Sequence, residues 1–188
     1  NDEQISNRPV DQGKKDLFLR HQKVLEKRDG QIGTKEGEIV AFFVPRRTYF
    51  LNKSLIHGGV YPDGVIRLIK KGKAFFPSKT VHEQIEIYGR VEWLYHDLIH
   101  NTYPTLVAYF KKADVYTSLT AEKFKKEKLR LGFYTTMIYI IVVPMKTFFS
   151  LYFRHLGFLD GLIGFVWAVF SALHRPVAYL KYLRKKLK

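Results

Sequence analysis

Two long apolar runs lie in the most basic half of this 188-residue chain, and this combination limits what it can fold into. Residues 101–188 carry a net charge of +11, against +4 for residues 1–100, and contain apolar runs at 132–145 and 157–173. Both runs are shorter than a helix that crosses a bilayer, which takes about 20 residues. Pro144 interrupts the first run, and Asp160 would be costly at a bilayer centre. We expect helices that bind peripherally or dip into one leaflet; burial in a soluble core is the alternative.

The C-terminal segment predicts a basic amphipathic helix. Pro176 suits the first turn of a helix. Three leucines then share one face, and basic residues share the opposite face: Leu180, Leu183 and Leu187 against Lys181, Arg184, Lys185 and Lys188. This pattern is typical of binding to an anionic membrane surface. Nucleic acid is a less favoured partner, because the aromatic residues lie inside apolar stretches rather than among exposed basic residues.

Composition and motifs exclude several classes of protein. The chain has no Cys, so it has no disulfide framework, iron–sulfur cluster or thiol nucleophile. With 46% hydrophobic residues it should fold. No Walker loop, GxGxxG, HExxH or GxSxG motif occurs. The chain begins at Asn1 without a charged and apolar leader, so we predict no signal peptide and treat the chain as a possible fragment.

The first half predicts a mixture of helix and strand. Helical spacing of apolar residues predicts a surface helix over 14–27. The stretch 39–51 is rich in β-branched and aromatic residues, and its Pro45 favours an edge or interrupted strand. Segments 65–69 and 73–76 predict a hairpin. Helix resumes beyond Thr105, so the local pattern supports a mixed α/β or α+β fold.

Four short segments carry residues suited to chemistry: Asn1-Asp2-Glu3; His57-Gly58-Gly59-Val60-Tyr61-Pro62-Asp63 with Arg67 downstream; Val81-His82-Glu83; and His96 to His100. With its flanks, the stretch 46–103 resembles the second half of bacterial family 2 glycosyltransferases of the lipopolysaccharide-core and cell-surface glycan type. Asn1-Asp2-Glu3 resembles the end of their metal motif, and Phe153 to Gly164 their membrane-associated region. Val60 departs from the family, which commonly has Trp there.

The resemblance implies a fold and an activity. The fold class is α/β: residues 1–104 would be the C-terminal part of a GT-A catalytic domain, without its upstream nucleotide-binding half. Residues 105–188 would form membrane-associated amphipathic helices. The intact enzyme would transfer a sugar from a nucleotide-sugar donor to a lipid-linked or cell-surface glycan acceptor, with inversion, at the cytoplasmic face of the inner membrane. This chain alone would be poorly active.

The resemblance also implies a metal site. Sugar transfer from a nucleotide donor needs a divalent cation to neutralise the diphosphate, and Mg²⁺ or Mn²⁺ prefers carboxylate oxygens. Asp2 is the candidate ligand, and its partner Asp would precede it by two positions. His100 resembles a downstream His that completes the metal site in related folds. Without the resemblance, Asp2 is a solvated acid at a chain end and His100 is structural.

An inverting transfer needs a carboxylate that deprotonates the acceptor hydroxyl. Glu83 is the candidate base, because its place beside His82 resembles the position where this superfamily carries its catalytic acid. An exposed Glu at a helix start is the alternative. His82 would orient Glu83 or contact the acceptor, or make a structural hydrogen bond. Asp63 is the second candidate base, and it could equally stabilise the Tyr-Pro-Asp-Gly turn.

Substrate binding is predicted at the His57 segment and at Arg67. Gly58 and Gly59 permit close backbone approach to a ligand, or simply form a turn. His57 and Tyr61 flank them within the family motif. Arg67 follows in a predicted strand, where a buried guanidinium would need a diphosphate or a carboxylate such as Asp63. A non-catalytic membrane-binding module is the alternative function, and a nucleic-acid-binding protein a less favoured one.

Overall fold

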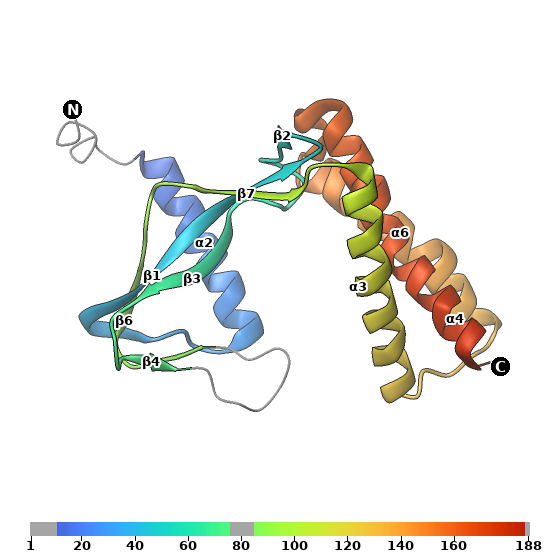
Figure 1. Ribbon diagram of the computed structural model, residues 1–188, viewed down its shortest axis with the longest axis horizontal. Helices are drawn as coiled ribbons and strands as arrows, with labels where there is room; N and C mark the ends of the chain where they lie inside the picture. Colours follow the sequence, from blue (N-terminus) through green and yellow to red (C-terminus); the bar gives the residue numbers. More distant parts are fainter. Residues whose placement is uncertain (1–10, 76–84, 187–188) are drawn as a thin grey trace. The chain divides into compact units, whose positions relative to one another are not determined.

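The computed structural model describes residues 11–75 and 85–186, which form a mixed α/β chain with a mostly antiparallel sheet (Figure 1). The elements group into two compact units. The first comprises the described residues of 1–47 and 62–99, and the second comprises 48–61 and the described residues of 100–188. Strand β1 (Thr34–Phe50) contributes to both units. Each unit has its own core.

In the first unit, helix α2 (Gln12–Asp29) covers one face of the sheet. The expected surface helix is therefore confirmed, with its N-terminus capped by the Asp11 side chain. Phe18 of α2 stacks on Trp93 at 4.7 Å between ring centroids, and Phe43 of β1 stacks on the same indole at 4.6 Å. Gly64 leaves room for this indole, since a Cβ there would lie 2.2 Å from Trp93. This aromatic stack is the core of the unit.

Strand β1 is the central strand of its sheet, which corrects the expectation that Pro45 marks an edge. It pairs antiparallel with β2 (Lys53–Ser54) and β3 (Asp63–Ile69), parallel with β6 (Arg90–Trp93), and also with β7 (Leu98–Tyr103). The Phe43 carbonyl accepts from Leu94 N on the β6 side. Backbone groups alternate sides along a strand, so Pro45 faces that same side, beyond the end of β6. Pro45 therefore removes no ladder hydrogen bond with β6.

The hairpin expected between 65–69 and 73–76 is wrong. Strand β4 (Ala74–Phe75) pairs antiparallel with β5 (Glu86–Ile87) in a separate two-stranded sheet. At the end of β3, Lys70 N donates to the Val40 carbonyl of β1 instead. Gly72, at φ +77°, then turns the chain away. Because β3 is already paired with β1, β4 pairs with β5 instead.

The second unit is built on three helical segments. Helix α3 (Leu106–Lys126) begins at a Thr105 cap. The next helix runs through α4 (Phe133–Met137), a π-helical turn (Ile138–Val142), α5 (Val143–Phe149) and a second π-helical turn (Ser150–Arg154). A 3₁₀ turn (Gly157–Asp160) leads into α6 (Gly161–Lys186), which packs against α3 and α5. Figure 1 shows these helices side by side.

Pro144 and Pro176 both lie inside long helices, which corrects two expectations. Pro144 follows the first π-helical turn, where the widened backbone accommodates a residue that cannot donate to the preceding turn. Pro176 lies buried in the middle of α6 rather than at the start of a separate helix. The two apolar runs therefore belong to continuous helices of 22 and 30 residues, long and apolar enough to cross a membrane by length and composition.

Aromatic side chains hold the second unit together. Phe50, fully buried at the end of β1, lies edge-on to Tyr103, Tyr109 and Trp167. At the other end of the helices the buried cluster consists of Ala121, Phe124, Ala178, Tyr179 and Tyr182. Tyr179 and Tyr182 thus face α3 and the 133–154 helix. Leu183 packs against the same cluster whereas Leu180 is exposed, so the expected leucine face is divided between core and surface, and Leu187 lies outside the described residues.

Candidate functional site

The His57 segment forms a tight loop that packs on the turn between the two apolar helices. Leu55, fully buried, anchors the loop, and its N–H donates to the Thr48 carbonyl. Gly58 and Gly59 both adopt the left-handed backbone, at φ +65° and +70°, which favours glycine. Gly58 N donates to the His155 carbonyl at 2.8 Å. The two glycines therefore serve a turn and a close backbone approach to the chain itself.

Asp160 holds this loop from the other side. Its Oδ2 accepts hydrogen bonds from the backbone N–H groups of Ile56 and His57, at 3.1 and 2.8 Å. Its Oδ1 lies 2.8 Å from His57 Nδ1. The Asp160 side chain is only 7% exposed, whereas the His57 side chain is 33% exposed. A buried carboxylate is thus satisfied entirely by the loop that carries a predicted substrate-binding histidine.

Glycines let the 3₁₀ turn bring Asp160 to the loop. A Cβ on Gly157 would lie 2.7 Å from the Leu151 carbonyl oxygen and 3.4 Å from Gly58 Cα. A Cβ on Gly164 would lie 1.9 Å from the Gly157 carbonyl oxygen. Gly161, at φ +64°, begins α6 directly after Asp160. The sequence Gly-Phe-Leu-Asp-Gly-Leu-Ile-Gly thus encodes a compact turn.

Gly164→Ala should destabilise this turn by about 1–3 kcal/mol, the usual cost of overpacking. The added methyl group has to displace backbone, not a flexible side chain. Gly132→Ala is the matched control, because a Cβ there meets nothing within 4 Å. It should cost only about 0.5 kcal/mol, for a slightly worse helix cap. Thermal unfolding of the two variants in one detergent makes the comparison, and equal losses would contradict the close packing.

Asp63, the second candidate base, is engaged in an ion pair in the first unit. It begins β3, opposite Arg46 of β1, and its Oδ2 lies 2.5 Å from Arg46 Nη2. Asp63 therefore sits in a strand, and the alternative of a turn-stabilising role is wrong. His21 of α2 is influenced by the same carboxylate. Burial lowers the pKa of His21, and the Asp63 charge opposes this.

Arg67 is exposed on β3, so the expectation of a buried guanidinium is wrong. Asp63, which was expected to satisfy Arg67, pairs with Arg46 instead. The register with β1 gives the physical reason. It shifts from Phe42 opposite Leu68 to Phe43 opposite Ile66, so Arg67 has no partner in β1 and lies at a β-bulge, next to an exposed Leu68. An exposed Arg67 needs no internal partner and is accessible to an anion.

Asp97, in the His96–His100 segment, has a structural role that sequence reasoning missed. Asp97 is only 10% exposed and lies 2.6 Å from Arg47 Nη2 and 3.3 Å from Lys14 Nζ. Lys14 also donates to the Tyr95 carbonyl at 2.7 Å. These contacts tie α2 and β1 to the segment after β6. Arg47 and Lys14 are 39% and 29% exposed, so these pairs satisfy the buried Asp97 carboxylate rather than form a fully buried ion pair.

The structure brings some predicted site residues together. His57, Gly58, Gly59 and Tyr61 share the second unit with His100, which lies half-buried in β7. Asp63 and Arg67 belong to the first unit. Across residues 11–75 and 85–186, no three His, Asp or Glu side chains gather as metal ligands. Asp2, His82 and Glu83 lie outside the described residues, so their roles stay predictions.

Comparison with known proteins finds similarity to a curated glycosyltransferase. No family model matches the chain, and no solved structure matches it significantly. The chain is 30% identical over 154 residues to the lipopolysaccharide core biosynthesis glycosyltransferase LpsC of Rhizobium meliloti (strain 1021). The match covers 80% of this chain and 56% of that protein, so the chain spans about half the length of this curated relative.

Proposed function

We propose that this chain is part of a glycosyltransferase that moves a sugar from a nucleotide-sugar donor to a lipid-linked or cell-surface glycan acceptor. The similarity to a lipopolysaccharide core glycosyltransferase over 154 residues carries the proposal. The match covers 80% of the chain, so a continuous match of that length includes the His57 loop. Membership of family 2, the partial GT-A fold and inversion at the anomeric carbon belong to the same proposal.

The proposal gives the site residues distinct roles. Glu83, oriented by His82, takes the proton of the acceptor hydroxyl, because Asp63 is already held by Arg46. His57 and Tyr61 bind substrate on the loop whose turn Gly58 and Gly59 form, and the exposed Arg67 is available to a diphosphate. An experiment on the full-length protein tests this: nucleotide-sugars are offered with an envelope glycolipid extract. Release of nucleoside diphosphate and a glycolipid heavier by one sugar residue are expected.

Mg²⁺ or Mn²⁺ is the proposed cofactor, although the described residues alone do not form a metal site. The proposal therefore depends on Asp2 and on His100. Asp2→Ala should weaken Mn²⁺-dependent donor binding roughly tenfold or more, because a carboxylate ligand is lost. Calorimetry with and without Mn²⁺ measures this. Unchanged affinity would remove Asp2 from the metal site.

We further propose that the second unit binds the cytoplasmic face of the inner membrane as a monotopic bundle. The 133–154 helix leaves many apolar side chains exposed, including Phe133 at 84% and Tyr134 at 78%. Exposed apolar surface of this extent marks an interaction site. An anionic membrane surface fits it, because the basic ends of α3 and α6 lie in the same unit.

The packing of α3 favours this in-plane arrangement over spanning helices. Helix α3 runs along α6, from Tyr109 against Phe170 to Glu122 against Lys185. It also carries Lys111, Lys112 and Asp114 midway. If α6 crossed the bilayer, these charges would enter the hydrocarbon at about 2.5–3.5 kcal/mol each. Binding through the exposed face of the 133–154 helix avoids that cost.

A non-catalytic membrane-binding module is the second candidate function, and the exposed face of the 133–154 helix is the observation that favours it. The two proposals differ in what the full-length protein binds. If calorimetry detects no binding of any nucleotide-sugar while liposome binding is intact, the result would favour the membrane-binding module. A high-affinity, strongly salt-dependent complex with duplex DNA would instead favour nucleic acid.

A further inference from the structure

We infer that Asp160 is a positioning residue that fixes His57 in one tautomer, so that His57 Nε2 accepts a hydrogen bond from a sugar hydroxyl. The inference rests on the proposed function and assigns a role to the turn between the two apolar helices. Asp160 lies 103 residues from His57 in sequence, yet its carboxylate makes three hydrogen bonds to residues 56 and 57.

The hydrogen bonds define the tautomer. An ionised carboxylate can only accept hydrogen bonds. Asp160 Oδ1, at 2.8 Å from His57 Nδ1, therefore requires the proton on Nδ1. In the neutral ring, Nε2 then carries a lone pair and acts as an acceptor. Within the described residues Nε2 makes no hydrogen bond, and the His57 side chain is 33% exposed. Nε2 is therefore the ring atom that can receive a ligand.

The arrangement exceeds what capping the loop requires. Oδ2 alone satisfies the two backbone donors of Ile56 and His57. Oδ1 adds the contact to the ring, on a side chain that is only 7% exposed. Burying a carboxylate is costly unless every oxygen is hydrogen-bonded. The backbone on both sides is fixed too, since Gly58 N donates to the His155 carbonyl and Gly164 lets the turn close.

The chemistry of the site selects the ligand class. A neutral imidazole acceptor suits a hydroxyl donor, and sugars present hydroxyl groups as their main polar groups. The hydroxyl could belong to the donor sugar or to the acceptor glycan. Michaelis constants measured separately for donor and acceptor distinguish these two sources. In either case Asp160 acts through His57 and does not touch the substrate.

Asp160→Asn is the test, because it keeps the shape and removes the charge. The asparagine carbonyl can still accept from the two backbone N–H groups. Its NH₂ group then faces Nδ1 of His57. Because an amide NH₂ can only donate, Nδ1 has to accept, and the ring proton then sits on Nε2. We expect ¹⁵N NMR of histidine-labelled full-length protein in micelles to show the Nδ1–H tautomer in the wild type and the Nε2–H tautomer in the variant. We also expect a five- to hundredfold lower kcat/KM, as for one lost buried hydrogen bond.

A double-mutant cycle separates positioning from loop stability. In a His57→Ala background, Asp160→Asn should cause no further loss of kcat/KM, because nothing remains to be positioned. An equal loss in both backgrounds would show a purely structural role and overturn the inference. So would an unchanged tautomer in Asp160→Asn. The NMR measurement needs no substrate, so a tautomer switch in a protein that transfers no sugar would refute the proposed function and the hydroxyl ligand, but not the coupling of Asp160 to His57.

Discussion

Glu83→Gln should lower turnover by roughly 100-fold or more while donor affinity stays nearly intact. This is the usual scale for loss of a general base, because glutamine keeps the size of the side chain but cannot take a proton. Steady-state kinetics of the full-length protein give kcat, and calorimetry gives donor affinity. A parallel fall in donor affinity would indicate that Glu83 binds the donor instead.

Asp63→Asn is the matched comparison. It removes the negative charge that faces Arg46. The Arg46 side chain is 21% exposed, and its Nε has no hydrogen-bond partner among the described residues. We expect a loss of about 1 kcal/mol in folding stability, typical of a partly exposed ion pair, and a smaller loss of turnover than for Glu83→Gln. If Asp63→Asn abolishes turnover while the protein stays folded, the two assignments exchange.

Local patterns predicted the helices well because helical spacing of apolar residues indicates a helix even where a residue stays exposed, as Val24 does beside the buried Phe18 of α2. The spacing of Leu17, Phe18, Val24 and Leu25 gave α2, and Tyr109 and Phe110 lie on the stripe by which α3 meets Phe170. Prolines misled the interpretation where tertiary structure supplied the compensation. Pro45 lies past the end of β6, Pro144 follows a π-helical turn, and Pro176 is buried in a long helix. None of these compensations is visible in local sequence.

The candidate site was only half predictable for a similar reason. The sequence motif identified His57, Gly58 and Gly59, whose turn chemistry is local. It could not identify Asp160 as their partner, because that contact depends on how the chain returns 103 residues later. The one available signal was an acid between glycines at the edge of an apolar run. Such an acid is costly unless something pairs with it, so it indicates a buried partner rather than a solvated face.

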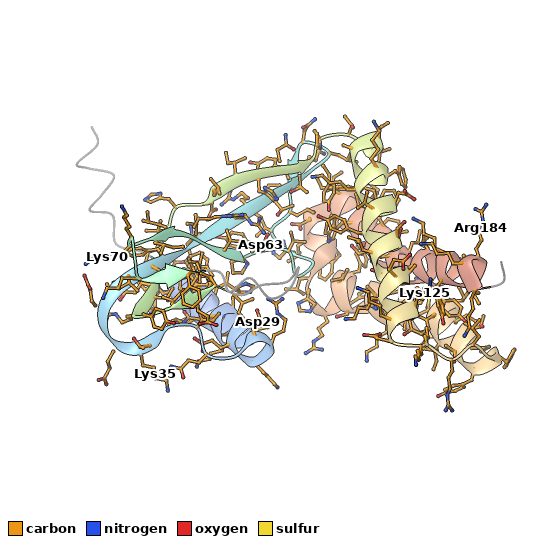
Figure 2. All side chains as sticks on the ribbon, turned by 60° about the horizontal axis from the view of Figure 1, so that its bottom comes forward. Asp29, Lys35, Asp63, Lys70, Lys125 and Arg184 are labelled. Atoms are coloured by element: carbon orange, nitrogen blue, oxygen red, sulfur yellow. The ribbon has the colours of Figure 1, made fainter. Side chains whose placement is uncertain are left out.

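The membrane prediction concerns the cations that remain free in the second unit. Lys181 and Lys185 were expected to face the lipid, but they pair with Asp114 and Glu122 of α3. Near the ends of α3 and α6, five exposed cations make neither an ion pair nor a cation–π contact within the described residues: Lys125, Lys126, Lys128, Arg130 and Arg184. Figure 2 labels Lys125 and Arg184 among them. Deleting 176–188 would be a poor test, because it would also remove Tyr179 and Tyr182 from the core.

Replacing these five cations with glutamine should weaken binding to anionic liposomes roughly 1,000- to 10,000-fold and remove most of its salt dependence. Each cation near an anionic leaflet contributes about 1 kcal/mol, and 1.4 kcal/mol is a factor of ten. The measurement is liposome flotation at several salt concentrations and anionic lipid contents.

The matched control changes the same number of charges on exposed lysines of the first unit: Lys23, Lys27, Lys35, Lys71 and Lys73. Both variants have the same net charge, so a difference between them reports the position of the cations and not their number. We expect near wild-type binding for the control, because the proposal assigns the lipid contact to cations of the second unit. Equal weakening by both variants would mean that no defined end of the bundle faces the membrane. Salt-independent association of all three proteins, released only by detergent, would instead favour helices that span the bilayer and contradict the in-plane bundle.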